Sequence, residues 1–368
     1  MSKKRINILC LPGDGIGPEV MDAAVSRILM PVLAHTGLDS SIKSGVIGWE
    51  AYDTFEDVMP TTTWDQCHAA DAILLGAVGL PLRDHELEPN MRPERRALLP
   101  LRQKLGLGVN IRPITVIPSL AHLSPLKERV IGGGVNITMF RELLGDVYFG
   151  KQDRDPGGQW ASDTGTYMLE QITSIAYVVF ETARLTGQKV TSIDKANVLC
   201  ATGSYWREVV THIHATEYPD VILEHQFVDS ANLDLFVNPG KFQIVMMPNL
   251  FGDILSDGAA GIAGSMGLLP SASLNPQTGK ALYEPAGGSA PDIAGHGVAN
   301  PVAMILSIAL MFRHTFKDED VAVAIESAVK SVLEKHGTPD ICKEKSQIVS
   351  TTELAHMIGN KTLQMLEG

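Results

Sequence analysis

The sequence predicts an α/β protein with a largely parallel sheet, because apolar runs alternate with Gly-rich turns and helical patterns. Residues 6–11 form an apolar run, and the turn after it leads into Pro18, which fits the first turn of a helix without losing a hydrogen bond. A second apolar run, residues 72–75, stops at Gly76. Strands that alternate with helices in this way are typical of parallel sheets covered by helices.

The middle and the C-terminal third add further elements. Apolar residues recur three and four apart over residues 167–185, which predicts a helix that ends at Gly187. The polar stretch 151–162 is either a disordered loop or an exposed β-arm. Three more elements are expected, a strand over 242–247 and helices over 302–312 and 321–333. With no internal repeat and no long linker, a second domain is expected to be inserted into the first.

Composition excludes several classes of protein. The 368 residues include 30 basic and 42 acidic side chains, a net charge of −12, which argues against binding along a nucleic-acid backbone. The longest uncharged apolar stretch, 302–312, is well short of the ~20 residues of a membrane span. The apolar run near the N-terminus is too short for a secretory signal. Four cysteines without C-x-x-C pairing indicate a reducing compartment, so we expect a cytoplasmic location and no membrane partner.

Two carboxylates stand four residues apart in an apolar setting. On a helix, Asp253 and Asp257 would share one face, and like charges so close repel unless a cation neutralises them. Neighbours such as Phe251 and Leu255 are apolar, and no Lys or Arg is close in the sequence. Oxygen ligands on one face suit Mg²⁺ or Mn²⁺, so we interpret the pair as a metal site, against the alternative of a solvated helix face.

Three arginines are set among apolar residues. Arg102, Arg112 and Arg141 are each expected to be semi-buried, where a guanidinium needs an anion and its fork fits a carboxylate. Three separate structural salt bridges are the alternative. Lys195 follows an apolar strand pattern, where desolvation favours the neutral form that a general base needs. A charge at the end of a structural element is the alternative there.

The Gly-rich turn at residues 13–18 departs from the dinucleotide-binding fingerprint. That fingerprint needs G-x-G-x-x-G, whereas here the third glycine, Gly17, comes one place early and Pro18 follows. A tight strand-to-helix turn explains these glycines as well as a ligand does. A classical Rossmann fold is therefore not expected.

Segments in order along the chain resemble the β-decarboxylating dehydrogenases, the isocitrate/isopropylmalate dehydrogenase family, and most closely its isopropylmalate branch. They are residues 11–20, 76–79, 141–143, 148–150, 194–199, 249–257, 270–274, 289–295 and 299–301. The resemblance covers nearly the whole chain. It implies that family's two-domain fold, with a cofactor-side domain at 1–107 and 264–368. The inserted domain at 108–263 would bind substrate and metal and carry a β-arm for dimerisation.

The resemblance also implies a reaction, the oxidation and decarboxylation of a 3-substituted malate by NAD⁺. The first expectation for the substrate is 3-isopropylmalate, an intermediate of leucine biosynthesis. Tyr148 would be the acid that protonates the enolate. Lys195 would be the base that takes the hydroxyl proton, acting from the partner subunit of a homodimer with shared active sites. The residues that would bind the substrate are Leu98, Leu99, Arg102, Arg112 and Arg141.

A divalent metal ion and a cofactor loop follow from the same resemblance. Asp253 and Asp257 would hold Mg²⁺ or Mn²⁺ together with Asp229 of the partner subunit. The cofactor loop, residues 284–300, would carry Asp292 and Ile293 at the adenosine ribose, where a carboxylate favours NAD over NADP. The other residues expected at the cofactor are Asn197, Glu284, Gly287, Gly288, Ser289, Ala290 and Asn300.

Departures from the isopropylmalate pattern leave the substrate open. A histidine usual in the adenine pocket is missing from residues 284–288, and Asp146 stands where glycine is usual. Counting back three from Leu98 reaches Arg95 instead of an acid, with Glu94 one place further. Either this segment carries one extra residue or a cation faces the C3 substituent. Tartrate, D-malate and homoisocitrate are therefore alternative substrates.

Two alternatives lie outside this class of enzyme. A non-catalytic regulatory paralogue should have lost the acid, the base or a metal carboxylate, and this chain keeps all of them. A protein that binds a small anion without turnover is the other alternative, and NADH absorbance would distinguish it.

Overall fold

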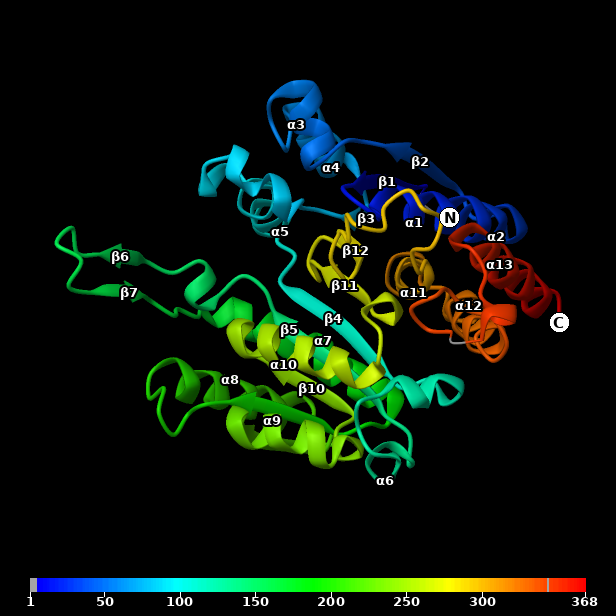
Figure 1. Cartoon of the computed structure of the whole chain (residues 1–368). Helices are drawn as coiled ribbons and strands as arrows, with labels where there is room; N and C mark the ends of the chain where they lie inside the picture. Colours follow the sequence, from blue (N-terminus) through cyan, green and yellow to red (C-terminus); the bar gives the residue numbers. More distant parts are fainter. Residues whose placement is uncertain (1–4, 343) are drawn as a thin grey trace. The chain divides into compact units, whose positions relative to one another are not determined.

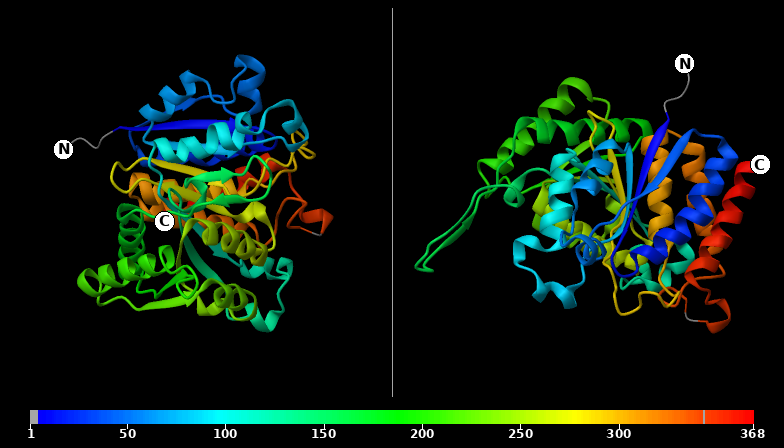
Figure 2. Two further views of the ribbon diagram at one scale, coloured as in Figure 1. Left: turned by 90° about the vertical axis from the view of Figure 1, so that its left-hand side faces the viewer. Right: turned by 90° about the horizontal axis from the view of Figure 1, so that it is seen from above.

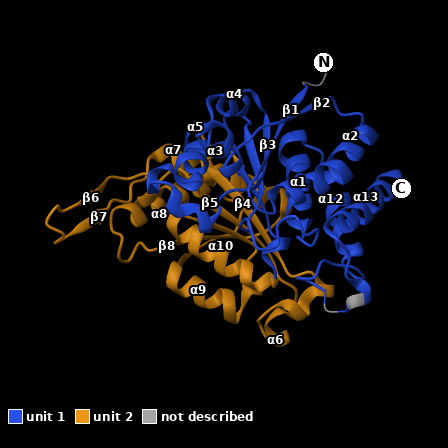
Figure 3. Cartoon of the chain, turned by 45° about the horizontal axis from the view of Figure 1, so that its top comes forward, with its two compact units in different colours: residues 1–105, 265–273, 277–368 blue, residues 106–264, 274–276 orange. Residues whose placement is uncertain are grey.

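The computed structural model describes residues 5–342 and 344–368 and divides the chain into two compact units (Figure 3). Unit 1 comprises Met1–Leu105, Ser265–Ser273 and Gln277–Gly368, and unit 2 comprises Gly106–Gly264 and Leu274–Pro276. Unit 1 is thus built from both ends of the chain, and unit 2 from its middle. None of the helices described in these residues is long and apolar enough to span a bilayer.

The strands of unit 1 follow the order β2-β1-β3-β12-β11 (Figure 1). Their bounds are Ile6–Gly13 for β1, Ser40–Ser44 for β2, Ala72–Ala77 for β3, Pro270–Leu274 for β11 and Ala281–Pro285 for β12. Strand β1 pairs in parallel with β2 and β3, and β3 pairs in parallel with β12. Every residue of β3 is buried, as its unbroken apolar run predicts. The strands predicted at 6–11 and 72–75 are confirmed.

Helices α1, α2 and α11 to α13 pack around this sheet and on one another. The helices of unit 1 are α1 (Gly17–Ala24), α2 (Met30–Thr36), α3 (Trp49–Phe55), α4 (Thr61–Ala69), α5 (Leu99–Lys104), α11 (Val302–Met311), α12 (Glu319–Val332) and α13 (Thr351–Glu367). A π-helical turn, Val25–Leu29, joins α1 to α2, which ends at Gly37 with φ +64°. The helices predicted over 302–312 and 321–333 are confirmed.

Unit 2 has strands in the order β4-β5-β10-β8-β9. Their bounds are Val109–Thr115 for β4, Asn136–Glu142 for β5, Val190–Asp194 for β8, Leu223–Phe227 for β9 and Ile244–Met247 for β10. Strands β4 and β5 are antiparallel, whereas the pairs β5–β10, β10–β8 and β8–β9 are parallel. The sheet is therefore largely parallel, and its parallel strands end on the same edge.

The helices of unit 2 are α6 (Glu128–Ile131), α7 (Leu169–Thr186), α8 (Thr202–Glu217), α9 (Val228–Val237) and α10 (Asn249–Ala263). Helix α7 buries the apolar face predicted for it and ends at Gly187. The polar stretch 151–162 belongs to a β-arm, in which β6 (Gln152–Arg154) and β7 (Ala161–Asp163) pair antiparallel with every residue exposed. Figure 2 shows this arm extending away from the rest of unit 2.

Candidate active site

Helix α10 carries the two candidate metal carboxylates of unit 2. It begins directly after β10 and Pro248, so its first turns lie at the edge where the parallel strands end. The sequence around Asp253 and Asp257 lacks a basic residue, but the fold places two arginines beside these carboxylates. Arg141 of β5 donates through Nη1 to Asp253, and Arg112 of β4 donates through Nη1 to Asp257 at 2.6 Å. The carboxylates are thus neutralised by arginines more than a hundred residues earlier in the chain.

The pairing of β4 with β5 explains why both arginines reach one helix. Arg112 lies opposite Met139, and Arg141 is two residues further along the same strand, so both side chains leave the same face of the sheet. The Arg141 side chain is 5% exposed and donates from Nε to Asn249 Oδ1 at 2.9 Å. A Cβ at Gly252 would lie 2.6 Å from Cγ of Arg141, so this helical position must stay a glycine. The expected semi-burial of Arg112 and Arg141 is observed.

Tyr148 lies in the same cluster, at the end of a 3₁₀ turn over Asp146–Tyr148. Its hydroxyl donates to Asp253, and its ring lies 5.3 Å from the guanidinium carbon of Arg141. Burial, reinforced by the Asp253 carboxylate, raises the pKa of Tyr148 to about 12, although Arg141 opposes the shift. The phenol therefore holds its proton at neutral pH, as a proton donor must.

Asp146 has a structural role that its sequence position did not reveal. Its φ of +68° explains why glycine would be the easier residue there. Its carboxylate accepts from the Leu250 amide at 3.1 Å, in the first turn of α10, and from the Tyr167 hydroxyl at 3.2 Å. A carboxylate at this position also meets the positive end of the helix dipole. Asp146 thus ties the turn that carries Tyr148 to the helix that carries the metal carboxylates.

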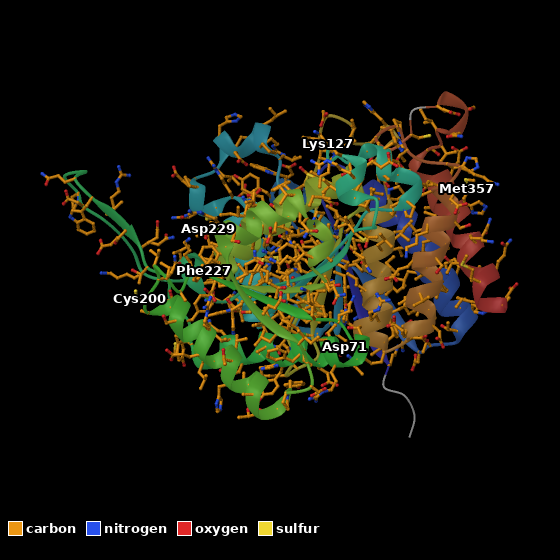
Figure 4. All side chains as sticks on the ribbon, turned by 90° about the horizontal axis from the view of Figure 1, so that it is seen from below. Asp71, Lys127, Cys200, Phe227, Asp229 and Met357 are labelled. Carbon is orange, nitrogen blue, oxygen red and sulfur yellow. The ribbon has the colours of Figure 1, made fainter. Side chains whose placement is uncertain are left out.

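Lys195 and Asp229 form a second charged pair of unit 2. Lys195 follows β8, Asp229 lies in the first turn of α9, and the parallel pairing of β8 with β9 places those strand ends side by side. The Lys195 Nζ donates to Asp229 Oδ1 at 2.6 Å, and this bond holds the pKa of Asp229 below its usual range. Figure 4 shows Asp229 beside Phe227, where β9 passes into α9.

Within the part of the chain that the structure describes, no three His, Cys, Asp or Glu side chains converge on one point that could hold a metal ion. The pair Asp253 and Asp257 supplies hard oxygen donors one helical turn apart, which fits Mg²⁺ or Mn²⁺, but Asp229 of the same chain does not complete the set. A third carboxylate would have to come from elsewhere, and a partner subunit is the source that the resemblance implies.

Unit 1 contains an apolar cavity of about 480 Å³ beside the cofactor loop. Five residues predicted at the cofactor line it, namely Gly287, Gly288, Ala290, Ile293 and Asn300. Met266 also lines this cavity, and a Cβ at Gly287 would lie 3.7 Å from the Met266 Cβ. The glycine that stands where a histidine is usual therefore leaves the wall apolar.

The remaining residues predicted at the cofactor lie around this cavity or outside unit 1. Glu284 accepts from Arg102 Nη2 at 2.9 Å, and both side chains are 12% exposed. Ser289 is buried, whereas Asp292 is exposed on the loop. Asn197 belongs to unit 2, in the turn after β8.

The Gly-rich turn after β1 packs directly against the cofactor loop. Gly15 has φ +59°, and a Cβ there would lie 1.9 Å from the Ser289 carbonyl oxygen. The Ile16 amide donates to that oxygen at 2.8 Å, and Ser289 Oγ donates to the Gly79 carbonyl at 2.5 Å. The glycines therefore serve as a tight turn and also let the loop approach, and Ile16 lines the cavity.

The segment before α5 contains a π-helical turn at the offset noted at Arg95. Residues Glu94–Leu98 form a π-helical turn, closed by a bond from the Leu99 amide to the Glu94 carbonyl. A π-turn contains one residue more than an α-turn, so this geometry is compatible with the hypothesis of an extra residue. Arg95 is exposed, and its Nη1 donates to Asn90 Oδ1 at 3.3 Å, in the turn before this segment.

Comparison with known proteins agrees with this geometry. The sequence model of isocitrate/isopropylmalate dehydrogenases matches residues 7–358. A 3-isopropylmalate dehydrogenase of Pseudoalteromonas translucida is 48% identical, covering 93% of this chain and 95% of that protein. One from Thermotoga maritima is 47% identical, covering 97% of this chain and 99% of that protein.

Among solved structures, the isocitrate dehydrogenase of Methylococcus capsulatus matches with a TM-score of 0.81 and 31% identity, covering 97% of this chain and 99% of that one. A β-decarboxylating dehydrogenase of Thermococcus kodakarensis matches with a TM-score of 0.79 and 31% identity, covering 98% and 97%. The predicted fold class, a family-type α/β fold distinct from a classical Rossmann fold, is confirmed. The chain belongs to the isocitrate/isopropylmalate dehydrogenase family.

Proposed function

We propose that the protein oxidises and decarboxylates 3-isopropylmalate to 4-methyl-2-oxopentanoate and CO₂, with NAD⁺ as oxidant and Mg²⁺ or Mn²⁺ as metal ion. The observation that carries the proposal is the cluster on α10, where Arg112, Arg141 and Tyr148 meet Asp253 and Asp257. This chemistry needs three kinds of group: cations for the substrate carboxylates, a protonated phenol, and oxygen donors for a metal. Relatives that are 45–48% identical across the chain are named 3-isopropylmalate dehydrogenases.

The roles proposed for the side chains are those that the family resemblance implies. When bound, NAD⁺ takes up a hydride and a divalent cation polarises the substrate hydroxyl. Arg102, Arg112 and Arg141 hold the carboxylates of the malate. Lys195 accepts the proton of the hydroxyl as the C2 hydride leaves, and the bond to the 3-carboxylate then breaks, with its electron pair remaining as an enolate. Tyr148 donates its proton to that carbon.

We assign the two compact units to the two expected domains. Unit 1 would be the cofactor-side domain, expected at 1–107 and 264–368, because it contains the apolar cavity and its loop. Unit 2 would be the inserted domain, expected at 108–263, because it carries the charged cluster and the β-arm. The active form would be a homodimer in which Lys195 and Asp229 of one chain serve the α10 cluster of the other. A cytoplasmic location belongs to the same proposal.

The segment Glu94–Leu98 supports an apolar C3 substituent. Arg95 is exposed and donates to Asn90, in the turn before this segment. We propose Leu98 and Leu99 as the apolar wall. Burial of a methylene contributes ~0.8 kcal/mol, so three carbons would favour isopropylmalate over malate by ~2 kcal/mol, or roughly 30-fold. Tartrate and D-malate lack these carbons and cannot gain this burial energy. Homoisocitrate would need a cation in place of the apolar wall.

A substrate panel tests the proposal. The purified enzyme is supplied with NAD⁺, Mg²⁺ and each hydroxy acid in turn, and NADH formation is followed by absorbance. We expect isopropylmalate to be turned over fastest and Arg95→Ala to keep that preference. Faster turnover of homoisocitrate or tartrate would refute the substrate assignment. An absence of turnover on every acid would favour the regulatory paralogue or the anion-binding protein.

A further inference from the structure

We propose that Glu19 is a positioning residue for the cofactor, because its carboxylate fixes the second half of the cofactor loop in the shape that lines the cavity. The proposal deepens the proposed function and rests on it, since it takes residues 284–300 to be the part of unit 1 that meets NAD. Glu19 itself would act only through the loop, while its neighbours Ile16 and Val20 line the cavity.

The Glu19 carboxylate joins three segments that are distant in sequence. Glu19 lies in the first turn of α1, immediately after Pro18. Its Oε2 accepts from the Gly295 amide at 3.0 Å, and its Oε1 accepts from the Ala299 amide at 3.1 Å. The buried Thr351 hydroxyl, at the start of α13, donates to Oε1 at 2.7 Å. One side chain thus satisfies two backbone donors of the loop and fastens them to two helices.

The loop has reason to need such an anchor. Gly295 and Gly297 have φ values of +75° and +69°, and glycines lose more conformational freedom on ordering than other residues. The other end of the loop is held at Ser289, whose carbonyl accepts from the Ile16 amide. Between the two anchors lies Ile293, which lines the cavity, beside the exposed Asp292. The end that Glu19 holds is also bonded by Thr351, whose amide donates to the Gly297 carbonyl at 2.9 Å and whose hydroxyl lies 2.7 Å from the Ala299 carbonyl. Loss of Glu19 would remove the two bonds to the Gly295 and Ala299 amides and so loosen this end of the stretch.

The charge of Glu19 suits this role. Partial burial alone would raise its pKa, but the Thr351 hydroxyl and the amides of Ala299, Gly297 and Gly295 outweigh burial and hold the pKa below its usual range. The group is therefore ionised at neutral pH and accepts at both oxygens. Hydrogen bonds to a charged acceptor are stronger than those between neutral groups, and a glutamine would present an amide N–H to one of these donors.

The test compares Glu19→Gln and Glu19→Ala with Asp22→Asn, which removes an exposed carboxylate from the same helix. We expect both Glu19 variants to raise the KM for NAD⁺ about tenfold, equivalent to 1.4 kcal/mol, with kcat within about twofold of the parent. Asp22→Asn should leave both constants unchanged. NADH titration by fluorescence should show the same loss of affinity without turnover.

A second measurement needs no cofactor. Hydrogen–deuterium exchange of the peptide spanning residues 289–299 should be at least several-fold faster in the Glu19 variants than in the parent and in Asp22→Asn. Thr351→Val keeps the buried volume and removes the hydroxyl that lies 2.7 Å from both Glu19 Oε1 and the Ala299 carbonyl, while the Glu19 bonds to the loop amides remain. It should move both readouts in the same direction by a smaller factor. It also provides the test if a Glu19 variant fails to fold.

The outcomes separate this proposal from the proposed function. Unchanged exchange in the loop, or faster exchange with unchanged NAD⁺ affinity, would overturn the role of Glu19 while the enzyme still turned over with NAD⁺. A parent enzyme that shows no NAD⁺-dependent turnover on any acid would instead overturn the proposed function. Faster exchange together with weaker NADH binding would support the role of Glu19.

Discussion

The two units build their candidate sites by different means. Unit 1 shapes an apolar cavity from backbone, with glycines that allow close approach and the Glu19 carboxylate that receives loop amides. Unit 2 relies on charged side chains, each already facing an opposite charge. Arg141 faces Asp253, Arg112 faces Asp257, and Lys195 faces Asp229.

This difference has an energetic meaning. A partly buried ion pair holds both partners in place, but removal of one partner leaves the other charge uncompensated. An anionic substrate that binds Arg112 and Arg141 would compete with Asp253 and Asp257 for the same guanidiniums. A divalent cation on those two carboxylates would replace the lost pairing. Substrate and metal should therefore bind unit 2 as a linked pair, whereas the cavity of unit 1 should accept its ligand with little exchange of partners.

The largest expected effect concerns whether the charged site of unit 2 is shared between chains. Lys195→Ala and Tyr148→Phe should each lose on the order of 10²–10⁴ in kcat, the usual contribution of a positioned acid or base. If the site takes Lys195 from the partner, an exchanged mixture of the two variants should recover up to about a quarter of parental activity, because half of the dimers then hold one intact site. No recovery, under conditions in which labelled subunits demonstrably exchange, would mean that each chain is self-sufficient.

The next effect concerns the carboxylates of α10. Asp253→Asn keeps the shape and removes the charge that faces Arg141 and Tyr148, so we expect kcat/KM to fall at least 10²-fold, the scale of a lost electrostatic contribution of ~3 kcal/mol. The matched control is Asp220→Asn, which breaks the exposed pair of unit 2 with Arg184 and should be nearly neutral. Removal of divalent ions by chelation should abolish turnover and weaken substrate binding, and added Mg²⁺ should restore both. Full turnover after exhaustive chelation would contradict the metal assignment.

A smaller effect is expected at the cavity of unit 1. The Asp292 carboxylate would repel a 2′-phosphate, so NAD⁺ should be preferred over NADP⁺. The double variant Asp292→Lys with Ile293→Tyr should narrow the ratio of kcat/KM values by about tenfold or more, since each 1.4 kcal/mol is a factor of ten. Equal kcat/KM for both cofactors in the parent enzyme would refute the preference. Asp22→Asn again supplies a control for a lost negative charge.

The smallest effects are those of pH on stability, where one buried group in each unit should act with opposite sign. Burial lowers the pKa of His314 in unit 1 from 6.5 to about 4, so the folded state binds fewer protons in that window. The contribution of neutral His314 to the free energy of unfolding is present above pH 6.5 and is lost as the pH falls toward 4. Burial raises the pKa of Glu142 in unit 2 from 4.5 to about 7, so the folded state binds more protons there and stability falls as the pH rises from 4.5 to 7.

Thermal unfolding at pH 5 and pH 7.5 checks both signs. For each variant, the quantity measured is its Tm minus the Tm of the parent. This difference should be more positive at pH 5 than at pH 7.5 for His314→Gln. It should be more positive at pH 7.5 than at pH 5 for Glu142→Gln. Shifts of the same sign for the two variants would show that these groups do not set the pH dependence.

The same contrast decides how much the sequence could predict. The strands and helices with clear periodicity were predicted, as were the charged residues of unit 2, because residue type alone marks them as chemically capable. The pairing of Arg112 and Arg141 with α10 could not be predicted, since it depends on the register of β4 against β5. The role of Glu19 could not be predicted either. Its partners are mainly backbone amides, which nearly every residue type has, so residue type does not identify them. The offset at Arg95 is visible in the sequence, whereas the π-turn that coincides with it is seen only in the structure.

The π-turn at Glu94–Leu98 has an evolutionary consequence. Each residue of a helix adds a rotation of about 100° about the helix axis. The loss of one residue here would therefore rotate the preceding residues about that axis relative to Leu98 and Leu99. An in-frame deletion of the Arg95 codon would remove the extra residue and place Glu94 three positions before the first leucine, within an ordinary α-turn. Gain or loss of a single codon is therefore a short mutational path by which the residues before Leu98 could be turned on the helix.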